Sequence, residues 1–241
     1  MTDTTTPTPD ATAHAREQTP PHAGPRALVL GVGFALVAAA ITATVAADAA
    51  KPAVQHLDDR WLQWMGGPHH GVLQGLAAAL DRFGGPHGIV VPIALLITLT
   101  IRQRWWSALC FLSTYVGGSM VVVQVLKNAL DRPRPLTPLV RVDHGSFPSG
   151  HAFGAALLTV LVGALFVPPT RRRVWWPLGV CFTAAMMWSR TWLHAHWLSD
   201  TVAGAAAGAA TALLLWCAFA PLLAREAGRR SEDGPRGRRE R

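Results

Sequence analysis

Long apolar runs are the feature that most constrains how this chain can fold. A helix needs about 20 apolar residues to cross about 30 Å of hydrocarbon, and six apolar runs alternate with short polar stretches here. Half of the 241 residues are hydrophobic and only 15% are charged. Because this profile is typical of a small polytopic membrane protein, we predict an all-α fold, a six-transmembrane helix bundle.

The six predicted spans form one membrane domain over residues 27–224. The first run is longer than the apolar core of a cleaved signal peptide, so we interpret it as a retained helix. The residues on either side, 1–26 and 225–241, lack apolar periodicity and are predicted to be disordered tails, the second one basic. The spans are Ala27–Ala47, Gly88–Ile101, Trp105–Leu126, Ala152–Val167, Val174–Trp188 and Leu198–Ala224.

The segment 50–82, after the first span, has a different pattern. Its hydrophobic residues, including Trp61 and Trp64, recur on one helical face, but charges such as Asp58 interrupt them. This pattern predicts one or two amphipathic helices at the membrane interface, with tryptophans at headgroup level. An ordinary soluble cap is the alternative interpretation.

Arginines between the spans predict how the chain crosses the membrane. They lie at Arg102 and Arg104, at 171–173, and in the segment 225–241, which holds seven arginines and four acids. In a six-span protein all these positions fall on one side together with both termini, and the positive-inside rule places that side in the cytoplasm. The net charge of +8 is therefore explained by topology and lipid headgroups, and we predict no nucleic-acid partner.

Three polar clusters then fall on the extracytoplasmic side. They are Lys127 to Pro135, Pro148-Ser149-Gly150-His151, and Ser189 to Asp200. Ionisable groups beside membrane spans are costly and indicate a functional site. The cations Lys127, Arg134 and Arg190 suit a phosphate group, and so do the free N–H groups of Ser149 and Gly150 where a helix begins.

Two histidines are candidate catalytic groups. His196 and Asp200 are four residues apart, so on one helix they share a face. Asp200 could then orient the ring and leave the other nitrogen of His196 free as a nucleophile. His151, on another loop, is the candidate general acid. We assign packing or interfacial roles to the remaining outer histidines, His69, His70, His87 and His194.

A zinc site is the competing chemical interpretation of the same cluster. It would use His151, His194, His196 and Asp200, but neighbouring cations would repel the metal and the spacing matches no common zinc pattern. We therefore predict neither a metal nor another cofactor. The other charged residues of the outer loop are predicted to be mostly solvated: Asp131, Arg132, Arg141, Asp143 and His144. Gly204 and Gly208 form a small-xxx-small pattern that favours close packing within the bundle, with dimerisation as the alternative.

The three clusters together resemble the signature of the type 2 phosphatidic acid phosphatase superfamily of membrane lipid phosphatases. That signature reads K-x6-R-P, then P-S-G-H, then S-R-x5-H-x3-D, and every position is matched here. The resemblance implies a metal-independent reaction through a phosphohistidine on His196, supported by Asp200, with His151 protonating the leaving group. It also implies phosphoryl-oxygen contacts from the remaining signature residues, Lys127, Arg134, Ser149, Gly150 and Arg190.

The expected activity is hydrolysis of a lipid phosphate or diphosphate at the outer face of the cell membrane. Undecaprenyl diphosphate, phosphatidylglycerol phosphate and phosphatidic acid are the candidate substrates. A lipid phosphotransferase that uses the same phosphohistidine with an alcohol acceptor is the alternative. A non-catalytic lipid-binding or lipid-translocating protein would be expected to lack the nucleophile or the acid, and both are present. The sequence does not indicate an oligomeric state.

Overall fold

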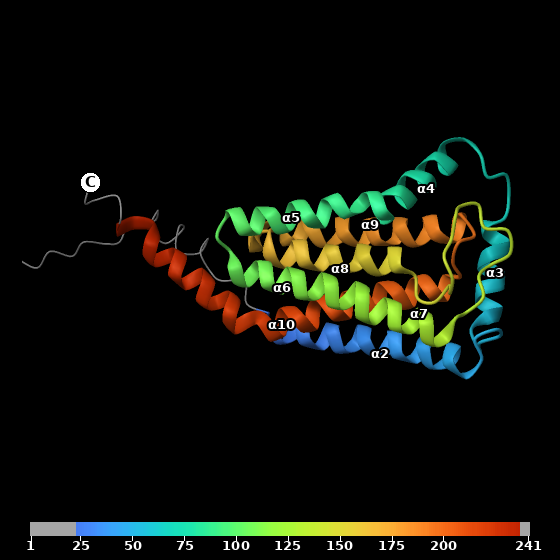
Figure 1. The fold of residues 1–241 in the computed structure, drawn as a ribbon, viewed down its shortest axis with the longest axis horizontal. Coiled ribbons are helices and arrows are strands. Elements are labelled where there is room, and N and C mark those ends of the chain that lie inside the picture. Colours follow the sequence, from blue (N-terminus) through green and yellow to red (C-terminus); the bar gives the residue numbers. More distant parts are fainter. Residues whose placement is uncertain (1–22, 237–241) are drawn as a thin grey trace, which may run out of the picture.

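The computed structural model describes residues 23–236, which form helices joined by loops (Figure 1). No strand occurs in this part of the chain, so the all-α prediction is confirmed there. The predictions for residues 1–22 and 237–241 lie outside the described residues. The helices are α2 (Pro25–Ala47), α3 (Gln55–Met65), α4 (Gly71–Gly84), η1 (Pro86–Ile89), α5 (Val90–Ile101), α6 (Trp105–Val116), η2 (Gly117–Val123), α7 (Gln124–Leu130), α8 (Gly150–Leu165), η3 (Pro169–Arg171), α9 (Arg172–Trp192) and α10 (Leu198–Arg236).

Three of the described helices are long and apolar enough to cross a membrane. They are α2, the continuous helix Trp105–Leu130 formed by α6, η2 and α7, and the part of α10 from Leu198 to Arg229. The pair α4 and η1–α5, bent by 52°, would be a fourth. Helix α8 is apolar but has only 16 residues. The chain is therefore a helical protein with three to four candidate spans, fewer than the predicted six.

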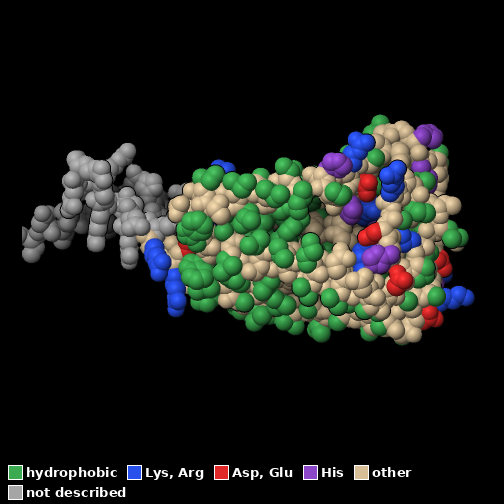
Figure 2. Space-filling model, in the orientation of Figure 1, with side chains coloured by type: hydrophobic (Ala, Val, Ile, Leu, Met, Phe, Trp, Pro, Cys, Tyr) green, Lys and Arg blue, Asp and Glu red, His purple; other side chains and the backbone are tan. Residues whose placement is uncertain are grey.

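Large apolar side chains remain exposed along the outside of the bundle. Leu28, Val29 and Leu30 on α2 are 49%, 69% and 55% exposed, and α5, α6 and α9 show the same pattern. Figure 2 shows hydrophobic side chains over most of the visible face of the bundle. Water-soluble monomers rarely expose so much contiguous apolar surface, whereas hydrocarbon accepts it. The protein is therefore a membrane protein.

Helix α10 packs closely against α8 because two small residues face that helix. A Cβ atom added at Gly204 would lie 2.4 Å from the carbonyl oxygen of Ser149, and one at Gly208 would lie 2.2 Å from that of Phe153. Such distances leave no room for a side chain. The predicted close packing through Gly204 and Gly208 is confirmed, and the two glycines are used within the chain rather than for a dimer.

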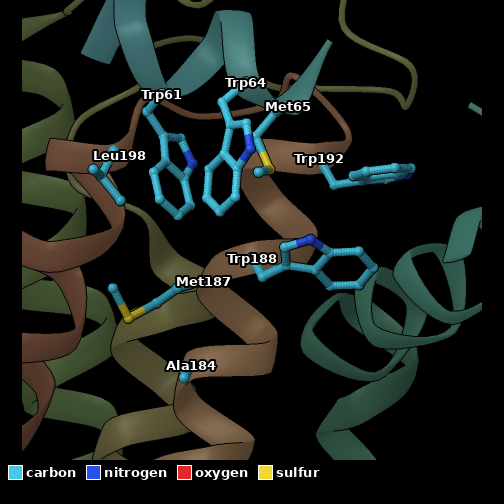
Figure 3. Close-up of a pocket in the computed structure, with 8 residues that line it drawn as sticks. All are labelled: Trp61, Trp64, Met65, Ala184, Met187, Trp188, Trp192 and Leu198. Atoms are coloured by element: carbon cyan, nitrogen blue, oxygen red, sulfur yellow. The ribbon is translucent and has the colours of Figure 1, made fainter. Parts of the chain in front are cut away.

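Helix α3 lies across one end of the bundle (Figure 1). Its Trp61, Trp64 and Met65 face Trp188 of α9 across an apolar cavity of about 490 Å³ (Figure 3). Asp58, on the same helix, is buried. The charge that interrupts the apolar pattern of the segment 50–82 therefore points into the protein, toward the loops described below.

The carboxyl end of α10 differs from the prediction. The sixth span was expected to end at Ala224 and to be followed by a disordered tail, but α10 continues to Arg236 and extends away from the bundle (Figure 1). Glu226 is buried and accepts hydrogen bonds from the backbone N–H groups of Trp106 and Ser107, at 2.7 and 3.1 Å. Because this carboxylate caps the first turn of α6, it holds α10 helical beyond the apolar run.

Candidate active site

The two outer loops that carry the polar clusters lie at the same end of the bundle. The loop between α7 and α8 contacts the loop between α9 and α10 through backbone hydrogen bonds. Leu139 donates to the carbonyl of Leu193, and Ser149 donates to that of Asp200 in the first turn of α10, both at 3.0 Å. Figure 2 shows charged and histidine side chains gathered at this end. The sequence-based prediction that these two segments meet is confirmed.

His196 is buried and held through its Nδ1 atom. Nδ1 lies 2.7 Å from the carbonyl oxygen of Ser146 and 3.6 Å from Oδ2 of Asp200. A carbonyl oxygen only accepts hydrogen bonds, so Nδ1 carries the proton and Nε2 keeps its lone pair. Nε2 lies 3.3 Å from a guanidinium nitrogen of Arg134. Asp200 was expected to fix this tautomer, but the closer partner is the Ser146 carbonyl.

Asp200 has no exposed surface and is already saturated with donors. Oδ1 accepts from Arg132 at 2.6 Å, while Oδ2 accepts from the hydroxyl of Ser146 and from the backbone N–H of Trp197. Arg132 also pairs with Asp58 of α3 at 2.8 Å. Arg132 is 1% exposed, so the prediction that it is a solvated loop residue is wrong. It links α3 to the carboxylate beside His196.

Lys127 and Arg134 share a single carboxylate, that of Asp143. The Nζ atom of Lys127 lies 3.0 and 2.9 Å from its two oxygens, and Arg134 donates to Oδ1. Arg134 is also held by backbone carbonyls, those of Asp143 and Gly145 at 2.9 Å each and that of Ala195. The two predicted phosphate-binding cations therefore lie side by side, and Arg134 also lies 3.3 Å from His196.

His151 and Arg190 are joined by Asp81 of α4. Nε2 of His151 lies 3.1 Å from the backbone carbonyl oxygen of Asp81 and 3.5 Å from its carboxylate, which also accepts a hydrogen bond from Arg190. The carbonyl contact places the proton of the neutral ring on Nε2. Arg190 is buried, and its Nε atom has no hydrogen-bond partner among the described residues.

The start of α8 combines a cap with an open position. The hydroxyl of Ser149 accepts a 3.5 Å hydrogen bond from the N–H of Ala152, which is a helix N-cap. A Cβ atom at Gly150 would meet only Val123, at an ordinary 3.7 Å. Packing within the chain therefore does not require glycine at this position, and the expectation that Gly150 lets a ligand approach the backbone stays a prediction.

The electrostatics of the site keep both histidines neutral. Burial, with Arg190 and Arg134, lowers the pKa of His196 to about 4, although Asp200 acts in the opposite direction. Burial and Arg190 lower the pKa of His151 to about 3, with smaller contributions from His196 and Lys127. Each of these six signature side chains therefore lies within electrostatic range of at least one of the two histidines.

His194 lies apart from this cluster. Its ring contacts the ring of His69 at 5.0 Å between centroids, and φ of 51° places its backbone in the left-handed region. The packing role assigned to it is confirmed. The four ligands of the zinc alternative do not converge, and no group of three or more potential metal ligands occurs between residues 23 and 229.

Sequence analysis missed four acidic or polar partners in the site. They are brought in by contacts that join distant segments, such as Arg132 with Asp58, 74 residues apart, and Arg190 with Asp81, 109 residues apart. Such pairs leave no periodic signal in the sequence. The one available signal was that a lone charge on the apolar face of an amphipathic segment is costly unless it is paired. The missed partners are Asp58, Asp81, Asp143 and Ser146.

Comparisons with known proteins agree with this geometry. A family model described as the PAP2 superfamily matches residues 107–223. The undecaprenyl-diphosphatase of Sulfolobus acidocaldarius is 27% identical over 139 residues, or 55% of this chain. Phosphatidylglycerophosphatase B of Bacillus subtilis is 26% identical over 133 residues, or 52% of this chain. Each match covers 64% of the relative's own length.

The fold also matches a solved structure. A transmembrane PAP2 type phosphatidylglycerolphosphate phosphatase from Bacillus subtilis superposes with a TM-score of 0.63 at 23% identity, covering 78% of this chain and 93% of that one. At this identity the likeness concerns the fold. Together with the family match and the signature residues gathered at one end of the bundle, it leads to one conclusion: this chain carries a PAP2 superfamily domain at residues 107–223.

Proposed function

We propose that this protein is an integral membrane phosphatase that hydrolyses a lipid phosphate or diphosphate through a phosphohistidine on His196. One observation carries the proposal. The 2.7 Å contact between Nδ1 and the Ser146 carbonyl leaves Nε2 unprotonated beside Arg134. A neutral imidazole with a free nitrogen next to a guanidinium is arranged to attack the phosphorus of a bound phosphate. The named relatives, a diphosphatase and a phosphatidylglycerophosphatase, act on lipid phosphates.

In the first step Nε2 of His196 attacks phosphorus, and the bond to the leaving oxygen breaks. Asp200 stabilises the positive charge that develops on the ring. Lys127, Arg134 and Arg190 stabilise the charge on the phosphoryl oxygens, together with the N–H groups at the start of α8. The unpartnered Nε–H of Arg190 is one donor still free for such an oxygen. Water then attacks the phosphohistidine and releases phosphate.

His151 supplies the proton for the leaving oxygen in this scheme. Its pKa of about 3 in the empty site means that it arrives there neutral. A bound phosphate adds negative charge beside the ring and raises that pKa, so the acid forms only when substrate is present. Nε2 faces the Asp81 carbonyl, which leaves Nδ1 as the nitrogen that takes up and delivers the proton.

An apolar cavity next to His151 supports a lipid leaving group. It has a volume of about 120 Å³ and is lined by the histidine and by apolar side chains such as Phe83, Tyr115, Phe182 and Met186. An acyl or prenyl chain leaving from the protonated oxygen could extend through this cavity toward the hydrocarbon. The three candidate lipids differ in headgroup and tail, and the phosphate-release experiment described below distinguishes between them.

We further propose the finer topology predicted from the sequence. Six spans place both termini in the cytoplasm and the site at the outer surface, because the arginine-rich loops lie at the opposite end from His196. Helices α3 and α4 then lie at the outer interface. The exposed Trp64, at 71%, suits the headgroup region, where tryptophan is enriched.

The proposed function is tested by phosphate release from purified protein in detergent. The substrates are undecaprenyl diphosphate, phosphatidylglycerol phosphate and phosphatidic acid, each with and without a metal chelator. We expect turnover of at least one lipid that chelation leaves unchanged. A phosphorylated alcohol in place of free phosphate would indicate the phosphotransferase instead. Binding without turnover of any lipid in the panel would contradict the proposal.

A further inference from the structure

The charged side chains that form ion pairs in the candidate site cancel one another. Five ion pairs join four cations to four carboxylates, so the sum of their formal charges is zero. A phosphate monoester carries close to two negative charges at neutral pH. Its arrival would leave this cluster with an excess of about two negative charges. Protonation of His151 would offset one of them, and a carboxylate that moves away would offset another. The cluster consists of Lys127, Arg132, Arg134, Arg190, Asp58, Asp81, Asp143 and Asp200.

The four carboxylates differ in how firmly they are held. The side chains of Asp58 and Asp200 are 1% and 0% exposed, and Arg132 joins them. Asp81 is 27% exposed and its backbone carbonyl also accepts from His151. Asp143 is 59% exposed and lies on the loop between α7 and α8. Of the four carboxylates, Asp143 can therefore turn into water with the smallest loss of buried contacts.

Asp143 also occupies the positions that a phosphate would need. Its two oxygens bridge Lys127 and Arg134, whose own side chains are only 6% and 10% exposed. Burial raises the pKa of Asp143, but hydrogen bonding and charge from Lys127, aided by Arg134, outweigh it and hold the pKa below its usual value. The carboxylate is thus ionised at neutral pH and competes directly with any anion for these two cations.

Arg134 would stay in place if this carboxylate left. Its guanidinium also donates to the backbone carbonyls of Asp143, Gly145 and Ala195. These contacts do not depend on the Asp143 side chain. Arg134 is therefore held in place by the backbone, while the carboxylate that covers it is exchangeable.

Resting on the proposed function of the site, we propose that Asp143 is a placeholder for the phosphate group. It neutralises Lys127 and Arg134 while the site is empty and turns into water when a phosphate binds. Two nearly buried cations without a counter-charge would destabilise the empty protein, so the placeholder trades anion affinity for stability. Asp143 thereby sets how tightly the site binds its phosphate group.

The test is direct binding of orthovanadate to the full chain in detergent, measured by isothermal titration calorimetry, with Asp143→Asn as the variant. Asparagine keeps the shape but removes the charge, and the exposed position makes misfolding a minor concern. We expect the dissociation constant to fall about tenfold, since two partly exposed ion pairs no longer compete. The matched control is Asp59→Asn, an exposed carboxylate on α3 that is hydrogen-bonded to Gln55, and it should leave the constant unchanged.

A second measurement is thermal unfolding with and without orthovanadate. Asp143→Asn should melt at a lower temperature than the parent protein in the absence of the anion, and vanadate should raise its melting temperature more. An unchanged or weaker vanadate affinity in Asp143→Asn would overturn the placeholder. The binding experiment does not depend on turnover, so failure of the placeholder proposal is distinct from failure of the proposed function. The proposed function fails if no lipid is hydrolysed, whatever affinity the variant has for vanadate.

Discussion

Among the described residues, buried ion pairs lie at both ends of the helix bundle, but the two clusters differ in what they leave available to a ligand. At the end opposite α3, Glu226 accepts four hydrogen bonds, from Arg104, from the N–H of Trp106, and from the N–H and hydroxyl of Ser107. Arg104 additionally donates to the carbonyl of Leu165. Every oxygen of this cluster is engaged in joining α10, α6 and α8.

The α3 end contains the same types of side chain in a different state. One carboxylate is largely exposed, a buried guanidinium nitrogen is unpartnered, and two neutral histidines stand beside the cations. A cavity adjoins one of those histidines. The comparison teaches that a buried ion pair by itself does not mark an active site. What marks one is incomplete pairing next to groups that can attack phosphorus or transfer a proton.

The largest expected effect comes from removing the proposed nucleophile. His196→Ala should lower phosphate release by about 10³-fold or more, since it removes the ring on which the proposed covalent intermediate forms. His194→Asn is the matched control, because asparagine tolerates the left-handed backbone and this ring contacts His69 rather than the cations. Phosphate release from a lipid that the parent protein hydrolyses is the measurement. Unimpaired turnover by His196→Ala would rule out the phosphohistidine.

Removing Arg132 tests whether the buried half of the site positions Asp200. Arg132→Met leaves Asp58 and Asp200 as unpaired buried carboxylates, which should destabilise the protein by about 3–5 kcal/mol. Arg132→Lys keeps the charge but not the planar fork, so it should recover part of the stability and part of kcat. Thermal unfolding and kinetics are the measurements. Parent-like kcat in both variants would show that Arg132 does not act through Asp200.

At the opposite end, Glu226→Ala should affect stability alone. The substitution removes the cap of α6 and the partner of Arg104, and a loss of about 1–3 kcal/mol is expected for such buried hydrogen bonds. The value of kcat per folded molecule should remain that of the parent protein. A large drop in kcat without a change in melting temperature would contradict the purely structural role of the Glu226 end.

The smallest expected effect is on the pH dependence of stability. It arises from the two buried histidines at the α3 end. Folding lowers the pKa of His196 to about 4 and that of His151 to about 3, from 6.5. Below pH 6.5 the unfolded chain therefore binds more protons than the folded one, and stability falls as the pH drops from 6.5 toward 4. The melting temperature of His151→Asn/His196→Asn should fall less over that range than that of the parent protein. Parallel curves would show that these rings are not buried as neutral groups.

Much of this arrangement was predictable because it depends on local pattern. The predicted spans begin and end within a few residues of the helices, apart from the carboxyl end of α10, since apolar length is legible in the sequence. The choice of His196 over His194 followed from its spacing to Asp200, and the structure places His196 beside Arg134 and His194 beside His69. The roles of these residues in a reaction stay predictions.

Other features could not be predicted, because they depend on which distant segments meet. Arg132 and Asp143 both looked like solvated loop residues, yet one is fully buried between two carboxylates and the other bridges two cations. The Ser146 carbonyl that sets the tautomer of His196 belongs to the backbone. Every residue has such a carbonyl, so the sequence does not indicate which one will contact the histidine.

The sequence by itself determined that the chain is helical and apolar enough for a membrane, and it supplied the candidate residues of a phosphate site at the ends of its helices. Only the tertiary structure decided how those residues are paired. Burial removes water as a partner, so every charge must find its counter-charge within the fold. That requirement brought Asp58 and Asp81 from the segment after the first helix into the site, and it left Asp143 as the exchangeable carboxylate.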